Sequence, residues 1–198
     1  MSLILEPRWK SYVVETLDPV LTPEQCNEII NIGQNSPQEV AQVGVGKPTD
    51  KKRKDVDTEK RITTISWISF KKARSIYSII EKCLNQVNAN HFGFEDVRIT
   101  ELGQYTEYAE KEFYDWHTDI SLEMSNMPPV RKISMTLLLS DRKDFEGGEL
   151  ELVDAKTQPN LKQGYALFFA SFIRHRVKPI IKGNRKSLVM WFGGTPFK

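Results

Sequence analysis

The chain has 198 residues, of which 39% are hydrophobic and 27% are charged, and its formal net charge at pH 7 is +2. This composition is typical of a globular protein with one sizeable core, and it excludes an intrinsically disordered chain. The net charge is too small to predict nucleic-acid binding by bulk electrostatics.

The first residues of the chain and its two cysteines indicate the cellular compartment in which the protein is expected. Residues 1–8 contain too short an apolar run for a signal peptide, and no later run approaches the length of a membrane span. Cys26 and Cys83 stand far apart, without the spacing of a redox or metal-finger motif. We therefore expect a cytoplasmic, intracellular protein with reduced thiols and no membrane partner.

Two helices are predicted in the first half of the chain. One begins after Thr22, which can cap it, with Pro23 in the first turn and Gln25 in the capping-box position, and it ends near Gly33. The second spans about residues 71–88, where apolar residues recur at three- and four-residue spacing. These residues are Ala73, Ile76, Tyr77, Ile80, Leu84 and Val87. The apolar stripe is expected to pack on the outside of a sheet.

Two segments are candidate lids over a binding site. Residues 34–61 include the run 47–61, which carries seven basic and four acidic residues, and a solvated loop is the favoured interpretation of this run. Residues 121–131 follow the His117-Thr118-Asp119 motif and would either line a substrate entrance or form a plain connection.

Short strands are predicted through the second half of the chain. The strand-like runs are residues 97–108, 132–139, 149–153, 165–170, 175–181 and 187–192, separated by Gly, Pro and Asp turns. Many short strands after a helical lead-in favour a β-sandwich or barrel. We predict one mainly β domain with flanking helices, in which residues 1–96 form a helical and strand support packed on a core formed by residues 97–198. Trp67, Trp116 and Trp191 are expected in the core.

A candidate metal site combines His117, Asp119 and His175. Two imidazoles and one carboxylate on one face of the ion form the ligand set of non-haem Fe(II) oxygenases. His117 and Asp119 stand two positions apart, so in an extended segment both side chains leave the same face. His-x-Asp alone is weak evidence, but His175 follows 56 residues later, as expected for a ligand from a different strand.

Arg185 and Ser187 are candidates for binding a dicarboxylate. The planar guanidinium offers parallel donors to both oxygens of a carboxylate, and Ser187 can add a hydroxyl from the same face. A simple hairpin between residues 179 and 184 would leave Arg185 roughly 23 Å from His175. A double-sheet jelly roll removes this difficulty, because consecutive strands can lie in opposite sheets about 10 Å apart.

With these residues in view, the chain from about residue 98 to 198 resembles the catalytic domain of the 2-oxoglutarate- and Fe(II)-dependent oxygenases. The resemblance is to their prolyl 4-hydroxylase-like, PKHD-type branch, whose fold is a double-stranded β-helix (jelly roll, cupin-like). The matching segments are QYTEY at 104–108, FYDWHTD at 113–119, FEGGEL at 145–150, GYALFF at 164–169 and the block 175–191. They lie in about half of the chain.

The resemblance implies a role for six residues. His117, Asp119 and His175 would ligate Fe(II), whereas Arg185, assisted by Ser187 and Tyr108, would bind the distal carboxylate of 2-oxoglutarate. Leu138 departs from the pattern, because relatives often carry a polar or aromatic co-substrate contact near this position.

The resemblance also implies a reaction. The enzyme would use O2 to hydroxylate a C–H bond and release succinate and CO2. The expected target is a prolyl or other amino-acid residue of a protein, peptide or small amino-acid-like substrate. L-Ascorbate would serve as the reductant that restores Fe(II). Asp119 argues against a halogenase, which leaves that ligand position vacant for halide.

Two other functions fit parts of the pattern. A nucleic-acid oxidative dealkylase shares the chemistry, but such enzymes usually carry a second arginine six residues after the first, where this chain has Trp191. A non-catalytic jelly-roll module would bind a metal or a small acid without iron-dependent turnover of 2-oxoglutarate.

Overall fold

Strands dominate the fold, as the apolar runs between turn residues predict. The computed structural model describes residues 11–41, 61–120, 129–153, 155 and 158–197. The strands of the large, eight-stranded sheet are, in spatial order, β1 (Val13–Glu15), β11 (Ala166–Ala170), β8 (Val130–Leu138), β14 (Arg185–Gly194), β6 (Gly103–Tyr108), β4 (Thr64–Ile68) and β2 (Glu39–Val40), with β5 (Arg98–Ile99) paired to β14. All of these neighbours pair antiparallel.

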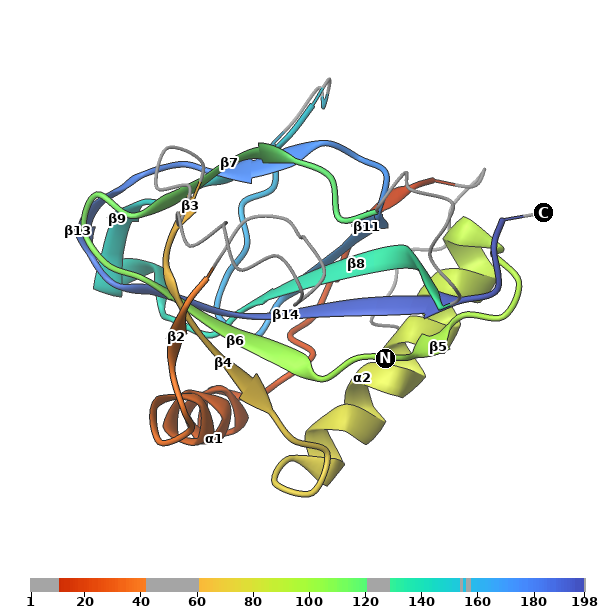
Figure 1. The fold of residues 1–198 in the computed structure, drawn as a ribbon, viewed down its shortest axis with the longest axis horizontal. Helices are drawn as coiled ribbons and strands as arrows, with labels where there is room; N and C mark the ends of the chain where they lie inside the picture. The colour runs from red at the N-terminus through yellow and green to blue at the C-terminus, as the bar shows by residue number, and fades with distance from the viewer. Residues whose placement is uncertain (1–10, 42–60, 121–128, 154, 156–157, 198) are drawn as a thin grey trace, which may run out of the picture.

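A smaller sheet and a two-stranded ribbon complete the architecture. The four-stranded sheet has the order β10 (Leu150–Leu152), β12 (His175–Val177), β7 (Phe113–His117) and β3 (Arg61–Ile62). The ribbon pairs β13 (Ile180–Gly183) with β9 (Phe145–Gly147). In Figure 1, β7 and β3 lie on one side of the large sheet, opposite the two helices.

The chain passes back and forth between the two main sheets. β6 belongs to the large sheet, β7 to the small sheet, β8 to the large sheet, and then β11, β12 and β14 alternate in the same way. The predicted jelly-roll fold is therefore confirmed, with no closed barrel among the described strands. This alternation also brings β12 and β14 to opposite sheets, so that a simple hairpin does not separate His175 from Arg185.

The two predicted helices form close to their expected bounds. In α1 (Pro23–Gln34), the Thr22 hydroxyl accepts a hydrogen bond from the Gln25 amide, and the Gln25 side chain accepts one from the Thr22 amide. α2 (Arg74–Val87) begins three residues later than expected, and its N-cap residue, Ala73, makes no side-chain hydrogen bond. At its end the helix continues into a π-helical turn, η1 (Asn88–Phe92). Among the described residues, no helix is long and apolar enough to cross a membrane.

Strand alternation divides the interior into two layers. Every second residue of β8 and of β14 faces the helices. Ile133, Met135, Leu188 and Met190 belong to this set and pack with the apolar stripe of α2. A second buried cluster lies between the sheets and includes Tyr108, Leu138, Leu150, Leu167, Phe169 and Val177. The same strands therefore bury an apolar face under the helices and present their other face to the inter-sheet space.

Several boundaries differ from the sequence prediction. The run 97–108 is divided into β5 and β6, and the run 175–181 into β12 and β13. A short 3-10 turn, η2 (Arg142–Asp144), precedes β9. Strands from the first 96 residues are hydrogen-bonded into the same sheet as the later strands, and the division at residue 96 stays a prediction. Most of the two candidate lids, residues 42–60 and 121–128, lies outside the described residues.

At Gly33, α1 packs directly against the large sheet. A Cβ atom at this residue would lie 2.3 Å from Cγ of the fully buried Tyr105. We expect Gly33→Ala to lower the free energy of unfolding by about 1–3 kcal/mol, because the helix must move away from the ring. Urea denaturation measures this change. Glu28→Ala, on the exposed face of the same helix, is the matched control and should change stability far less. Equal effects of the two substitutions would contradict the predicted packing.

Candidate active site

Antiparallel pairing of β7 with β12 brings two histidines together. His117 ends β7, His175 begins β12, and the two residues are register partners across the sheet. Asp119 lies two residues beyond β7, where its backbone amide donates to the Ser171 carbonyl at 3.0 Å. One possible ligand atom from each of the three side chains lies within 4.8 Å of the others. The structure thus assembles the three residues that the sequence singled out.

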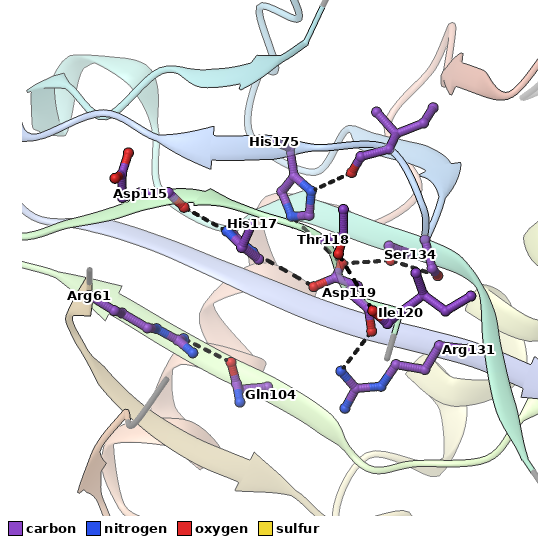
Figure 2. A network of polar contacts seen from close by, with 12 residues as sticks. Arg61, Gln104, Asp115, His117, Thr118, Asp119, Ile120, Arg131, Ser134 and His175 are labelled. Atoms are coloured by element: carbon purple, nitrogen blue, oxygen red, sulfur yellow. Dashed lines mark hydrogen bonds and ion pairs between the residues drawn. The ribbon is translucent and has the colours of Figure 1, made fainter. Parts of the chain in front are cut away.

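Hydrogen bonds orient both imidazole rings toward Asp119. His117 Nδ1 donates to the Asp115 carbonyl at 2.7 Å, and His175 Nδ1 donates to the Ile173 carbonyl at 3.0 Å. Because a carbonyl only accepts, the Nδ1 atoms carry the protons and the Nε2 lone pairs are available. The Nε2 atoms lie 3.7 Å and 3.6 Å from the carboxylate oxygens of Asp119, and Figure 2 shows the three side chains converging.

The carboxylate of Asp119 is held ionised by its surroundings. Burial acts to raise its pKa, but the attraction of His175 and His117 and the hydrogen bond from Ser134 hold the pKa below its ordinary value. The Ser134 hydroxyl donates to Asp119 Oδ2 at 2.6 Å (Figure 2). Burial, assisted by repulsion from His175, lowers the pKa of His117 to about 4.

The donor set fits a divalent transition-metal ion. At neutral pH His117 is neutral and Asp119 is anionic, so both are in the protonation state that binds a metal. Each Nδ1 proton is held by a backbone carbonyl, an arrangement that fixes the orientation of metal-binding histidines. Two imidazole nitrogens and one carboxylate are the ligands of non-haem Fe(II) sites.

A cavity of about 440 Å³ opens beside the three residues. Alternate side chains of three strands of the large sheet point between the sheets and form the floor of this cavity. They are Gln104 and Tyr108 on β6, Thr136 on β8, and Val189 and Trp191 on β14. Tyr108 therefore lies where the sequence places it. Trp191 is buried as expected, but Trp67, expected in the core, is 38% exposed and lines the same cavity.

Arg185 and Ser187 lie deeper, next to this cavity. Arg185 is 3% exposed, donates from Nη1 to the Ser187 hydroxyl at 3.1 Å, and lies with Cζ 5.8 Å from the centre of the Tyr108 ring. It lines a small pocket of about 30 Å³ together with Leu138 and Leu150, and Leu150 also lines the large cavity. Burial lowers the pKa of Arg185, and no carboxylate among the described residues pairs with it.

Sequence reasoning missed four polar residues at the site, three of which line the cavity, while Ser134 contacts Asp119. Arg61, assigned to a solvated loop, is instead 7% exposed, since it forms β3 at the edge of the small sheet. Gln104 accepts from Arg61 Nη2 at 3.1 Å, Ser134 orients Asp119, and Arg131 pairs with Glu101. Gln104 and Tyr108 are separated by an even number of positions on β6, so both side chains leave the same face of the strand. This spacing could have identified Gln104 from the sequence.

Comparisons of the sequence identify its relatives. The model of the 2OG-Fe(II) oxygenase superfamily matches residues 103–193. A PKHD-type hydroxylase of Idiomarina loihiensis is 32% identical over 157 residues, which are 77% of this chain and 69% of that protein. A PKHD-type hydroxylase of Alteromonas mediterranea is 32% identical over 92 residues, or 44% of this chain and 41% of that protein.

Two solved structures share the fold. The viral collagen prolyl hydroxylase of Paramecium bursaria Chlorella virus-1, solved as a 2OG complex, has a TM-score of 0.70 at 18% identity and covers 93% of this chain and 97% of its own. A prolyl hydroxylase of Trichoplax adhaerens, in complex with a hypoxia inducible factor peptide fragment, has a TM-score of 0.70 at 17% identity, with 92% and 84% covered.

The lowered pKa of His117 makes stability depend on pH in the metal-free protein. An unfolded histidine titrates near 6.5 and folded His117 near 4, so the unfolded chain binds this proton more readily. The stability from neutral His117 is complete above pH 6.5 and is lost as the pH falls toward 4. We expect a loss on the order of 1–3 kcal/mol in this window by urea denaturation. His117→Gln should flatten the slope, and an unchanged slope would contradict the shifted pKa.

Proposed function

The chain belongs to the 2OG-Fe(II) oxygenase superfamily, in its PKHD-type hydroxylase branch, and we propose that it hydroxylates a C–H bond of a prolyl or other amino-acid residue. The protein is thus an oxidoreductase of a family that uses Fe(II) and 2-oxoglutarate. The proposal adds the substrate class, the release of succinate and CO2, and the assignment of the site residues.

The observation that carries the proposal is the convergence of His117, Asp119 and His175. Both Nε2 lone pairs face the Asp119 carboxylate, and all three ligand atoms lie within 4.8 Å of one another. We assign these three residues as the iron ligands. Bound iron would supply the oxidising chemistry with O2 and 2-oxoglutarate, and L-ascorbate as a reductant stays a prediction of the family resemblance.

Arg185 supports the assignment of the co-substrate site. A buried cation without a carboxylate partner is costly, and an incoming carboxylate would compensate its charge. The guanidinium can bind both carboxylate oxygens, with the Ser187 hydroxyl beside it and the ring of Tyr108, which lines the cavity, 5.8 Å from its Cζ. We assign Arg185, Ser187 and Tyr108 to the distal carboxylate of 2-oxoglutarate. Leu138, in the wall of the same small pocket, offers no polar group to it.

The cavity suits an amino-acid side chain as the target. Trp67, Trp191, Val177 and Leu150 give it apolar walls, and its volume of about 440 Å³ leaves room for a ring of proline size beside the co-substrate. The Trichoplax enzyme, which shares this fold, was solved with a peptide fragment. A peptide, protein or small amino-acid-like substrate is therefore part of the proposal. At the dealkylase position the chain has Trp191, which stacks with the guanidinium of Arg131 at 3.9 Å.

The residues of the chain have separate tasks in this reaction. Asp115 and Ile173 hold the imidazole protons through their carbonyls, and Ser134 keeps the Asp119 carboxylate in place. The Tyr114 ring stacks on His117 with 3.5 Å between ring centres, and the Phe169 ring meets His175 at 4.6 Å. These rings exclude water from two sides of the proposed metal site. The target bond is then oriented by the cavity walls.

An anaerobic titration with Fe(II) and 2-oxoglutarate tests the site assignment. We expect the visible charge-transfer band of the chelate in the wild-type protein, no band with His175→Ala, and a requirement for at least about 10-fold more 2-oxoglutarate with Arg185→Ala. Lys182→Ala, an exposed cation on neighbouring β13, should behave as wild type. Absence of the band from the wild type would favour the non-catalytic binding module.

The Ser134 hydrogen bond gives a second, independent expectation. Loss of a hydrogen bond that orients a metal ligand typically weakens metal binding by about 10–100-fold, so Ser134→Ala should reduce Fe(II) affinity to this extent. Ser134→Thr keeps the hydroxyl and should retain most of the affinity. Competition with a chelator of known affinity measures both variants, and an unchanged affinity in Ser134→Ala would refute the role of this residue.

A further inference from the structure

Arg61 is a buried cation whose charge is not neutralised by the described part of the chain. It lines the large cavity with the three proposed iron ligands. Its Nη2 donates to the neutral side chain of Gln104, and its Nε is buried without a hydrogen-bond partner. None of the ion pairs between described residues includes it. Within the described ranges, this permanently charged and buried group therefore has no carboxylate counterion.

Arg131, the other arginine of the cavity wall, differs in this respect. Its Nε and Nη2 donate to the two carboxylate oxygens of Glu101 at 2.6 Å and 2.5 Å. The charge of Arg131 is therefore balanced within the chain. Arg185 also lacks a carboxylate partner, and the proposed function supplies one in 2-oxoglutarate. Arg61 is a second cation that pairs with no described carboxylate, and it lies at the large cavity and not at the small pocket of Arg185.

The position of Arg61 relative to the proposed metal site is fixed by stacking. Its Cζ lies 4.4 Å from the centre of the Tyr114 ring, and that ring stacks on His117 at 3.5 Å with an angle of 11° between the planes. Gln104, which receives the Arg61 hydrogen bond, also accepts from Thr106 at 3.4 Å. Figure 2 shows the contact between Arg61 and Gln104. The guanidinium is thus held one aromatic ring away from a proposed iron ligand.

We propose that Arg61 binds a carboxylate of the substrate and selects substrates that carry this group close to the hydroxylated C–H bond. The inference rests on the proposed function. Burying an unpaired cation is unfavourable, and an incoming carboxylate offsets that cost while its two oxygens match the planar donors of the guanidinium. Loop solvation does not explain Arg61, because the side chain is 7% exposed.

Two kinds of substrate could supply the carboxylate that binds Arg61. One is the α-carboxylate of a free amino acid or of a chain terminus, and the other is the side chain of Asp or Glu in a peptide. The apolar walls from Trp67 and Trp191, whose ring centres are 6.4 Å apart, suit the aliphatic part of either molecule. The test therefore includes an arm for each source.

The test compares ligands that differ only in charge. The protein is loaded anaerobically with Fe(II) and 2-oxoglutarate, and dissociation constants are measured by isothermal titration calorimetry. One arm pairs free L-amino acids, including proline, with their α-carboxamides. The other pairs N-acetylated, C-amidated dipeptides containing Asp or Glu with the same peptides containing Asn or Gln. The visible band of the chelate is recorded for every variant.

The wild type should bind the carboxylate member of at least one pair about 10-fold more tightly than its amide, or better. Arg61→Gln should abolish this preference, and Arg61→Lys should retain part of it, because the charge persists without the planar fork. Arg74→Gln, an exposed cation on α2, is the control and should keep the full preference. The arm that shows the preference identifies the source of the carboxylate.

The outcomes separate this inference from the proposed function. If the band forms but the wild type binds both members of every pair equally, the role of Arg61 is overturned and the iron site stands. A carboxylate preference that survives in a folded Arg61→Gln variant would also overturn the role of Arg61 and leave the iron site standing. If Arg61→Gln does not fold, the wild-type pairs and Arg61→Lys decide the question. If the wild type forms no band, the proposed function fails and this inference fails with it.

Discussion

The register between β7 and β12 is the constraint on which the site depends. Because His117 and His175 are direct partners in this ladder, their side chains leave the same face of the small sheet. A slip of one residue would turn one imidazole to the opposite face. Asp119 needs only the extension of the chain beyond β7, where the Ser171 carbonyl and the Ser134 hydroxyl hold it. A backbone hydrogen-bond pattern thus determines the convergence of three side chains.

Charge balance explains how the rest of the cavity is organised. Arg131 is neutralised by Glu101 and acts as part of the wall under Trp191. Arg185 and Arg61 have no such partner in the described chain, and they lie at different places, one beside the small pocket and one in the large cavity. Neither cation has a counterion among the described residues, and the proposed dicarboxylate co-substrate and the proposed carboxylate-bearing substrate would each supply one.

The strands of the large sheet serve stability and function at once. On β14, Leu188 and Met190 pack under α2, whereas Ser187, Val189 and Trp191 face the space between the sheets. On β6, Tyr105 packs against Gly33 of α1, and Gln104 and Tyr108 face the cavity. Helix packing therefore fixes the strands whose other face forms the site. This arrangement gives the rigid support that a catalytic site requires.

Local periodicity and motif chemistry made several features predictable from the amino-acid sequence. The capping box of α1, the apolar stripe of α2 and the two-residue spacing of His117 and Asp119 all depend on residues close together in the chain. The family resemblance added the jelly roll, which the structure confirms. Strand bounds followed less well, since short breaks at residues 100–102 and 178–179 separate β5 from β6 and β12 from β13.

The distant residues that complete the site became apparent from the folded chain alone. The sequence around Arg61 is typical of a charged loop. Its burial could not be predicted, because it arises from the long-range pairing of β3 with β7. Ser134 and Gln104 have the correct strand parity, but parity does not say which residue of another sheet each one meets. Those contacts depend on how two sheets pack face to face, and that packing is set by long-range pairing that local sequence does not encode.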